Sequence, residues 1–211
     1  MRQSASIFKP TANWRNLHLY QKSDTLYQLT VVFCRRFMPS YGDRTVDQMV
    51  QAARSGKQNV VEGSEDGKTS TEMELKLLNV ARASIGELRE DYEDYLKCHG
   101  LEQWDRRHYR FDAMLDFCRK NNEYKAYASM VEVLSDEEFC NMAVTLCHIT
   151  DRMMCSYLNR LEKTFVTEGG IKERMHAART GYRKEQDQRL RQLEEENQRL
   201  KDLLKQNNID F

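Results

Sequence analysis

Residues 69–100 read TSTEMELKLLNVARASIGELREDYEDYLKCHG and form the longest uninterrupted apolar pattern of the chain. The apolar side chains recur at intervals of three and four residues, so they share one face of an α-helix. They are Leu75, Leu78, Ala81, Ile85, Leu88, Tyr92 and Tyr95. Thr69 and Glu72 have the spacing of a capping box, and His99-Gly100 is a stop signal. The stretch predicts a long helix with one face in a core.

Three further segments, 24–38, 45–63 and 135–168, carry apolar stripes with the same spacing. Their expected N-terminal caps are Ser23 or Asp24 for the first, Thr45 with Gln48 for the second, and Ser135 with Glu138 for the third. The stripes consist of Leu26, Leu29, Phe33 and Phe37; Val46, Met49, Val50, Ala53, Val60 and Val61; and Phe139, Met142, Leu146, Ile149, Met153, Tyr157, Leu161 and Phe165. Four amphipathic helices predict an all-α protein with an antiparallel up-down four-helix bundle.

The remaining segments complete the predicted domain organisation. Residues 1–22 are expected to be a mostly irregular lead-in, and residues 23–168 the bundle. Before the last bundle helix, two short helices around 104–119 and 123–134 form a packed excursion, and Gly169-Gly170 ends that last helix. Residues 169–182 are expected to be a suffix or linker helix.

Residues 183–208 have a different apolar pattern. Their leucines alternate steps of three and four and form the a/d seam of a coiled coil. The seam consists of Leu190, Leu193, Asn197, Leu200 and Leu204. Asn197 at an a position favours a parallel two-stranded pairing, since its amide is satisfied across the seam only in register. The tail therefore predicts self-association. The alternative is a single helix that docks on the bundle or frays.

The composition sets limits on partners and location. Lys plus Arg and Asp plus Glu each total 33, so the net charge is zero and no whole-molecule field attracts nucleic acid or anionic lipid. No stretch approaches the ~20 apolar residues that span a bilayer, and the first ten residues lack a secretory apolar region. The six cysteines indicate reduced core thiols. These features predict a cytoplasmic protein without membrane association.

The residue types that carry catalysis or bind metals are not arranged in a known pattern. A di-iron bundle needs Glu-x-x-His on two helices, and only Glu173 with His176 has this spacing. Four other residues could supply zinc ligands, but their spacing fits no zinc module: Cys98, His99, His108 and Cys118. Cys147 and His148 are helix neighbours and point about 100° apart. The sequence predicts a non-enzymatic protein without metal or cofactor.

A local basic patch is the candidate binding surface. It consists of Arg35, Arg36, Arg44, Arg54 and Lys57, on the first two predicted helices and the turn between them. Because antiparallel helices joined by a short turn bring such side chains to one end of a bundle, the patch predicts contacts with phosphates of RNA or DNA. The alternative is a solvated face paired with Asp43, Asp47 and Glu62.

Two segments resemble a known family. Residues 51–63 read QAARSGKQNVVEG and residues 79–88 read NVARASIGEL. They resemble the four-helix bundle proteins first noticed as 23S ribosomal RNA intervening-sequence proteins, and the matching residues are Asn59, Glu62, Gly63, Ser84, Glu87 and Leu88. Residues 43–49, 90–96 and 169–175 look like the subgroup with a C-terminal suffix. The resemblance covers about residues 20 to 180.

The resemblance implies a homopentameric ring. It also implies a distant similarity to the accessory protein of diversity-generating retroelements, which binds a reverse transcriptase and nucleic acid. That accessory protein is strongly basic, whereas this chain is neutral and carries an additional coiled-coil tail. We therefore expect a homo-oligomeric scaffold or adaptor that acts with a protein partner, such as a reverse transcriptase. Direct binding of RNA or DNA through the basic patch is the alternative.

Overall fold

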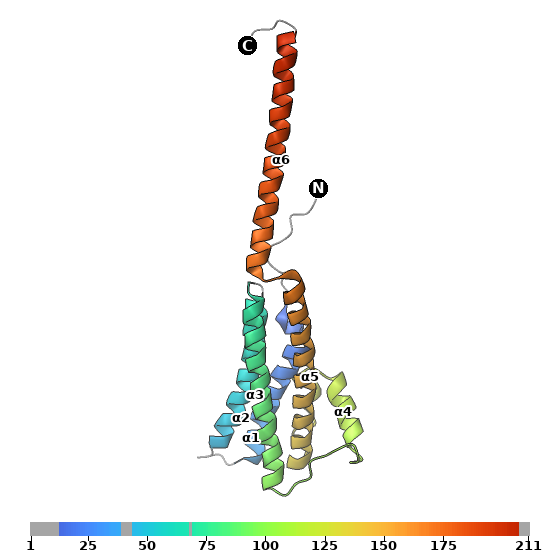
Figure 1. Cartoon of the computed structure of the whole chain (residues 1–211). Coiled ribbons are helices and arrows are strands. Elements are labelled where there is room, and N and C mark those ends of the chain that lie inside the picture. Colours follow the sequence, from blue (N-terminus) through green and yellow to red (C-terminus); the bar gives the residue numbers. More distant parts are fainter. Residues whose placement is uncertain (1–12, 39–43, 68, 207–211) are drawn as a thin grey trace. The chain divides into compact units, whose positions relative to one another are not determined.

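The computed structural model describes residues 13–38, 44–67 and 69–206, and this part of the chain contains helices and no strand (Figure 1). The α-helices are α1 (His18–Phe37), α2 (Arg44–Asp66), α3 (Thr71–Cys98), α4 (Phe111–Lys120), α5 (Asp136–Glu168) and α6 (Ile171–Gln206). Two 3-10 turns, η1 (Trp14–Asn16) and η2 (Tyr124–Ala126), complete it. The predicted all-α class is confirmed.

The chain divides into two compact units, and the division falls between Thr167 and Glu168. The unit of residues 9–167 contains α1 to α4 and nearly all of α5. The other unit contains α6, a single continuous helix that runs through both the predicted linker, 169–182, and the described part of the predicted coiled coil. The end of that coiled coil, residues 207 and 208, lies outside the described residues.

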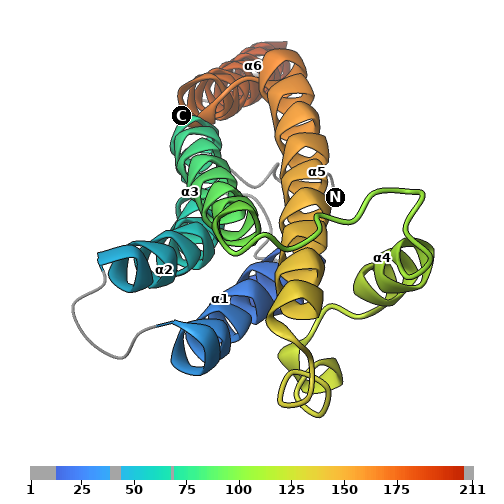
Figure 2. The same cartoon turned by 90° about the horizontal axis from the view of Figure 1, so that it is seen from below.

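A shared hydrophobic core is built by α1, α2, α3 and α5, which Figure 2 shows from one end. Phe33 of α1 has no exposed surface, and its ring contacts α3 through Tyr92 and Tyr95 at centroid distances of 5.0 and 4.9 Å. The same ring contacts Phe139 of α5 at 5.4 Å. Burial of one such aromatic side chain stabilises a fold by roughly 1.5–3 kcal/mol.

Contacts at both ends of α3 show its direction relative to α5. Near the start of α3, the Tyr157 hydroxyl donates to Glu74 Oε1 at 2.8 Å. Near its end, the Tyr95 hydroxyl donates to Asp136 Oδ2 at 3.4 Å, at the start of α5. The start of each helix therefore lies beside the end of the other, and the two helices are antiparallel.

Two glycines let α2 approach α3 closely. Gly56 is buried, and a Cβ atom there would lie only 2.7 Å from Cδ1 of Ile85. Gly63 is also buried, beside Leu77 and Leu78 of α3. The prediction that the helix ends at Gly63 is wrong, because α2 continues to Asp66. This glycine serves helix packing rather than helix termination.

The first helix begins earlier than predicted. Its bounds include residues 18–22, which the sequence assigned to the irregular lead-in. Ser23, one of the two expected caps, is instead a buried helical residue whose hydroxyl donates to the Leu19 carbonyl at 2.9 Å. A serine hydroxyl can also bond a carbonyl four residues back within a helix, so the presence of Ser23 did not mark the true start.

Two other predicted caps are also corrected. Thr45 lies inside the first turn of α2, which begins at Arg44, so Thr45 is not the N-cap. The N-cap of α3 is Ser70 rather than Thr69, and its hydroxyl accepts a hydrogen bond from the Met73 amide at 3.1 Å. Thr69 donates to the Asp66 carbonyl at the end of α2 instead.

The other helix boundaries agree with their signals. At α5 the Ser135 hydroxyl accepts from the Glu138 amide at 3.2 Å, and Glu138 Oε2 accepts from the Ser135 amide at 3.0 Å, which is the predicted capping box. Gly100, at φ 66°, follows α3, and the Leu101 amide donates to the Leu96 carbonyl at 2.9 Å. Gly169, at φ 72°, follows α5. Both positive φ values favour glycine.

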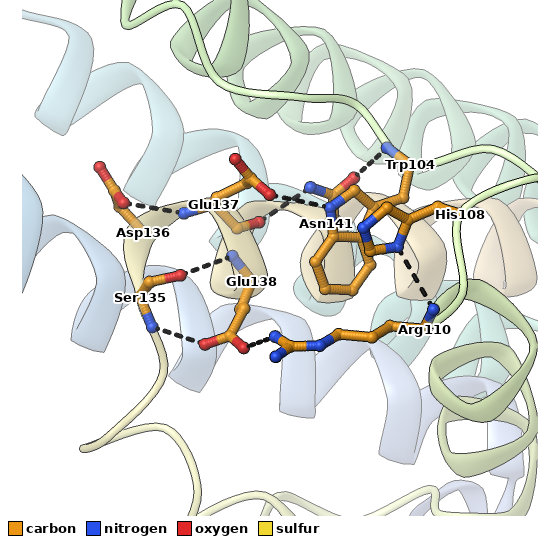
Figure 3. Close-up of polar contacts among 8 residues, drawn as sticks. All are labelled: Trp104, His108, Arg110, Ser135, Asp136, Glu137, Glu138 and Asn141. Carbon is orange, nitrogen blue, oxygen red and sulfur yellow. Dashed lines mark hydrogen bonds and ion pairs between the residues drawn. The ribbon is translucent and has the colours of Figure 1, made fainter.

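The excursion between α3 and α5 is less helical than predicted. Helix α4 begins only at Phe111, and the second predicted helix is reduced to the 3-10 turn η2 and turns around it. The Trp104 amide donates to Asn141 Oδ1 of α5 at 2.7 Å (Figure 3). Asp105 Oδ1 accepts from the Arg107 amide at 2.7 Å. Both amides are therefore bonded to side chains, which favours a non-helical backbone at residues 104–107.

Helix α1 anchors the other end of α4. The ammonium group of Lys22, only 2% exposed, donates to the carbonyls of Cys118 and Asn121 at 2.6 and 2.9 Å. The Thr25 hydroxyl donates to the Asn122 carbonyl at 2.9 Å. Burial lowers the pKa of Lys22. These donors satisfy carbonyls that the end of a helix leaves without intrahelical partners.

One predicted core residue is exposed. Phe165, the last member of the α5 stripe, has 37% of its surface exposed, whereas Leu161 one turn earlier is 8% exposed. The buried part of the stripe therefore ends at Leu161, about two turns before the end of α5.

We predict opposite effects of adding side chains at two helical glycines. Gly56→Val should lower the free energy of unfolding by about 1–3 kcal/mol, because the new methyl groups must displace buried Ile85. Gly86→Ala is the matched control: a Cβ there meets nothing within 4 Å, so the variant should gain about 0.5–1 kcal/mol from reduced backbone entropy in the unfolded state. Urea denaturation measures both, and equal effects would contradict the close approach of α2 to α3.

Candidate functional site

The candidate interaction surface is the leucine seam of α6, which comprises Leu190, Leu193, Asn197, Leu200 and Leu204. Helix α6 spans 36 residues and none of them is buried. Leu190, Leu193 and Leu200 are 57%, 54% and 54% exposed, and Asn197 is exposed among them. Since these positions alternate steps of three and four, they form one apolar line along the helix.

Pairing of this seam with another helix would bury apolar surface. Burying a whole leucine side chain is worth roughly 1.5–3 kcal/mol, so four half-exposed leucines can still contribute several kcal/mol on pairing. The surrounding positions carry charged side chains, such as Glu194 to Glu196 and Arg199, and these are exposed. In coiled coils, a partner helix covers a narrow apolar line of this kind between charged flanking positions.

The predicted basic patch is largely engaged in intramolecular contacts. Arg36 donates to the carbonyls of Val131 and Leu134, the latter at 3.0 Å, and its guanidinium lies over the Phe37 ring. Arg35 pairs with Glu132 at 3.2 Å. Both arginines of α1 thus hold the end of the excursion, close to the start of α5.

The patch residues of α2 fall into two classes. Lys57 pairs with Asp24 of α1 at 3.2 Å and lies 4.3 Å from the centroid of the Tyr27 ring. Arg44 and Arg54 are exposed, and within the described residues neither forms an ion pair. Three of the five predicted phosphate-binding cations therefore have intramolecular partners.

The acidic residues proposed as an alternative pairing for this patch are placed differently. Asp47 and Glu62 form no ion pair with the patch within the part of the chain that the structure describes. Asp43 lies outside the described residues. The actual counter-ions, Asp24 and Glu132, come from α1 and from the excursion, and sequence proximity did not indicate them.

An acidic groove between α2 and α3 was not singled out from the sequence. It has a volume of about 570 Å³ and is lined by Asp47, Glu87 and Asp91, with Ser55 and Ser84 between the helices. The two serine hydroxyls are 2.9 Å apart. Burial raises the pKa of Asp91 to about 6, and Asp94, Glu87 and Glu90 add to the effect by repulsion. A cationic partner would relieve this repulsion.

The metal and thiol candidates are scattered. Within residues 13–38, 44–67 and 69–206, no group of three or more His, Cys, Asp or Glu side chains is placed to hold a metal ion. Cys98 is exposed at the end of α3, whereas Cys118 is buried and burial raises the pKa of its thiol to about 12. The imidazole of His108 stacks on Trp104 at 4.2 Å.

The Cys147-His148 pair does not form a nucleophile and base. Cys147 is 1% exposed, and burial raises the pKa of its thiol. His148 is exposed on the same helix, and burial of part of its ring together with the charge of Arg89 lowers the pKa of the imidazole. A thiol that stays protonated and inaccessible is a poor nucleophile.

Comparison of the chain with protein-family models, with curated proteins and with solved structures finds no match. The resemblance to the intervening-sequence proteins thus stays a prediction. In the part of the chain that the structure describes, none of the helices has the length and apolar character needed to cross a bilayer.

The placement of the patch predicts different stability effects for its arginines. Arg36→Ala should lower the free energy of unfolding by about 1–3 kcal/mol, because two carbonyls of the excursion lose their charged donor. Arg54→Ala, the matched exposed arginine, should change it by less than about 0.5 kcal/mol. Chemical denaturation compares them, and equal stabilities would show that Arg36 is a solvated surface cation.

The raised pKa of Asp91 predicts a pH-dependent stability difference. Since the folded-state pKa of about 6 exceeds the ordinary 3.8, the wild type loses stability as pH rises through this window. Asp91→Asn should remove this loss and be more stable at pH 7 by about 1 kcal/mol, after allowance for solvent screening. Urea denaturation between pH 4 and 7 measures it, with Asp112→Asn as the control for one lost surface charge. Parallel pH profiles of wild type and Asp91→Asn would refute the prediction.

Proposed function

We propose that this protein is a non-enzymatic homo-oligomeric scaffold or adaptor, in which α6 joins copies of the chain and residues 9–167 present surfaces to a protein partner. The observation that carries the proposal is the exposure of the α6 seam, because no residue of this 36-residue helix is buried. A helix with so little apolar surface gains most of its stability from packing against a partner.

We further propose that α1, α2, α3 and α5 form an antiparallel up-down four-helix bundle of the intervening-sequence type. The opposite directions of α3 and α5 support this arrangement. The ion pair between Lys57 and Asp24 and the hydrogen bond from Trp14 Nε1 to Glu65 at 3.1 Å support opposite directions for α1 and α2. A rigid bundle provides several helix faces for protein contacts.

The stoichiometry of the assembly is a separate proposal. Asn197 within the seam favours parallel pairing of two α6 helices, because a buried Asn side chain is best satisfied by its own copy in a dimer. The family resemblance instead implies five copies joined through the bundle. The two are compatible if the bundles form rings and the tails pair between rings.

The partner in this proposal is a protein, for example a nucleic-acid-handling enzyme such as a reverse transcriptase. Direct RNA or DNA binding is the alternative, and Arg44 and Arg54 are the patch residues with accessible charge and no ion pair among the described residues. Neutralising several phosphates makes affinity fall steeply with salt, whereas apolar docking between proteins depends on salt much less. A salt titration with single-stranded RNA therefore separates the two classes.

We predict that charges in the seam reduce the assembly size. In full-length Leu193→Glu/Leu200→Glu, like charges would face each other across the pair, so the molar mass at micromolar concentration should fall relative to wild type. Gln192→Glu/Arg199→Glu is the matched control, because both positions lie outside the seam, and its mass should not change. Sedimentation equilibrium measures all three.

The outcomes distinguish the parts of the proposal. A monomeric wild type would overturn the scaffold, and a wild-type mass retained in the seam variant would overturn assembly through α6. A five-membered ring remaining in the seam variant would show that the bundle assembles by itself. Asn197→Leu should shift the assembly towards three or more strands, since the polar a position selects two.

A further inference from the structure

A second groove, about 480 Å³ in volume, lies between α4 and α5, which are neighbours in Figure 2. Its apolar lining comes from Phe111 and Leu115 of α4 and from Ile149 and Met153 of α5. Each pair is four residues apart, so it lies on one face of its helix. All four side chains are only partly buried, so apolar surface remains accessible in the groove.

Three arginines surround this apolar surface: Arg106 before α4, Arg119 on α4 and Arg152 on α5. All three are exposed, and none forms an ion pair or a side-chain hydrogen bond with another described residue. The carboxylates nearest to them in sequence have other partners: Asp105 pairs with Arg107, Asp116 with Lys120, and Asp151 with Arg82, each at 2.6 Å. The groove thus combines apolar surface with uncompensated positive charge.

The other polar groups of the groove are uncharged at neutral pH. The hydroxyls of Thr145 and Ser156 line it, and so does the imidazole of His148. Burial and the charge of Arg89 lower the pKa of His148, so its ring is neutral near pH 7 and can donate or accept a hydrogen bond. An anion that enters the groove would therefore meet guanidinium groups and neutral hydrogen-bonding groups.

The walls of the groove are held by the polar network in Figure 3. The Trp104 indole donates to Glu137 Oε1 at 3.0 Å, and Asn141 holds the Trp104 backbone amide. At the start of α4, Arg110 pairs with Glu138 of the capping box. Lys22 holds the other end of α4. Because α4 is attached to the core at both ends, the groove is pre-formed.

We propose that this groove binds a small organic anion with an apolar body, namely a carboxylate or phosphate monoester that carries an alkyl or aryl group. The apolar body would contact Phe111, Leu115 and Met153. The anionic group would pair with an arginine at the edge of the groove, because the forked donors of a guanidinium group suit carboxylate and phosphate oxygens. The volume lies within the roughly 300–1,000 Å³ of small-molecule sites. This binding goes beyond the scaffold function and does not require oligomerisation.

Calorimetric titration of the full-length protein tests the required combination of groups. Decanoate and decyl phosphate should both bind, whereas decyltrimethylammonium, with the same tail and the opposite charge, and inorganic phosphate, with no tail, should bind at least about tenfold more weakly. Equal binding of the cationic and anionic amphiphiles would overturn the proposal. The proposal would also be overturned if neither decyl anion bound at concentrations up to millimolar, even if an acidic peptide did bind.

Two variants locate the site. Arg119→Glu and Arg152→Glu should each weaken decanoate binding about tenfold or more, because each replaces a cation at the groove by a like charge. Arg54→Glu, at an arginine of α2 that is also exposed but does not line the groove, should leave affinity unchanged. Equal losses in all three would indicate a non-specific charge effect and overturn the assignment.

NMR spectroscopy of the ligand-bound protein gives a second test, which does not depend on whether these variants keep their fold. With methyl-labelled methionine, decanoate should shift the NMR signal of Met153 and leave that of buried Met49 in α2 unchanged. Binding without a shift of the Met153 signal would place the ligand elsewhere and overturn the proposal.

Discussion

The packing of α1 against α3 and α5 depends on the buried ring of Phe33. This ring brings α1 against Tyr92 and Tyr95 of α3 and against Phe139 of α5, so a single side chain joins three helices. Polar groups in this region have partners as well: the Tyr92 hydroxyl donates to Thr30, which donates to the Leu26 carbonyl. Such satisfied groups avoid the desolvation cost of a buried hydroxyl.

Helix α1 also determines where the irregular excursion lies. Lys22, Thr25 and Arg36 reach carbonyl oxygens about a hundred positions later in the chain, and these carbonyls belong to the end of α4 and to the turns before α5. A cation near the end of a helix is favoured by the partial negative charge of its carbonyls. Arg36, which the sequence placed in a surface patch, thus bonds the turns before α5. Lys22, which is outside that patch, bonds the end of α4 and so helps to hold the groove beside it.

The zero net charge conceals an uneven distribution. The groove between α2 and α3 is lined by carboxylates, and burial together with their mutual repulsion raises the pKa of Asp91, whereas the groove between α4 and α5 has three arginines without carboxylate partners among the described residues. Local fields of this kind select partners even when the whole molecule exerts no field, since screening confines them to about 8–10 Å at physiological salt. A net charge of zero therefore does not exclude the binding of charged partners at a local site.

Periodicity was sufficient to predict the helical class and, except at Phe165, the core stripes, because apolar spacing of three and four residues indicates one face of a helix. It also predicted the line of leucines along α6, whose pairing stays a prediction. Local signals also located Gly100, Gly169 and the capping box at Ser135. They failed at Ser23 and Gly63, where the same residue types serve a helix interior and a close helix contact. The partners of Arg36 and the groove beside α4 required the folded structure. Ion pairs and grooves are formed by residues that are distant in sequence, and their proximity arises only when the helices pack.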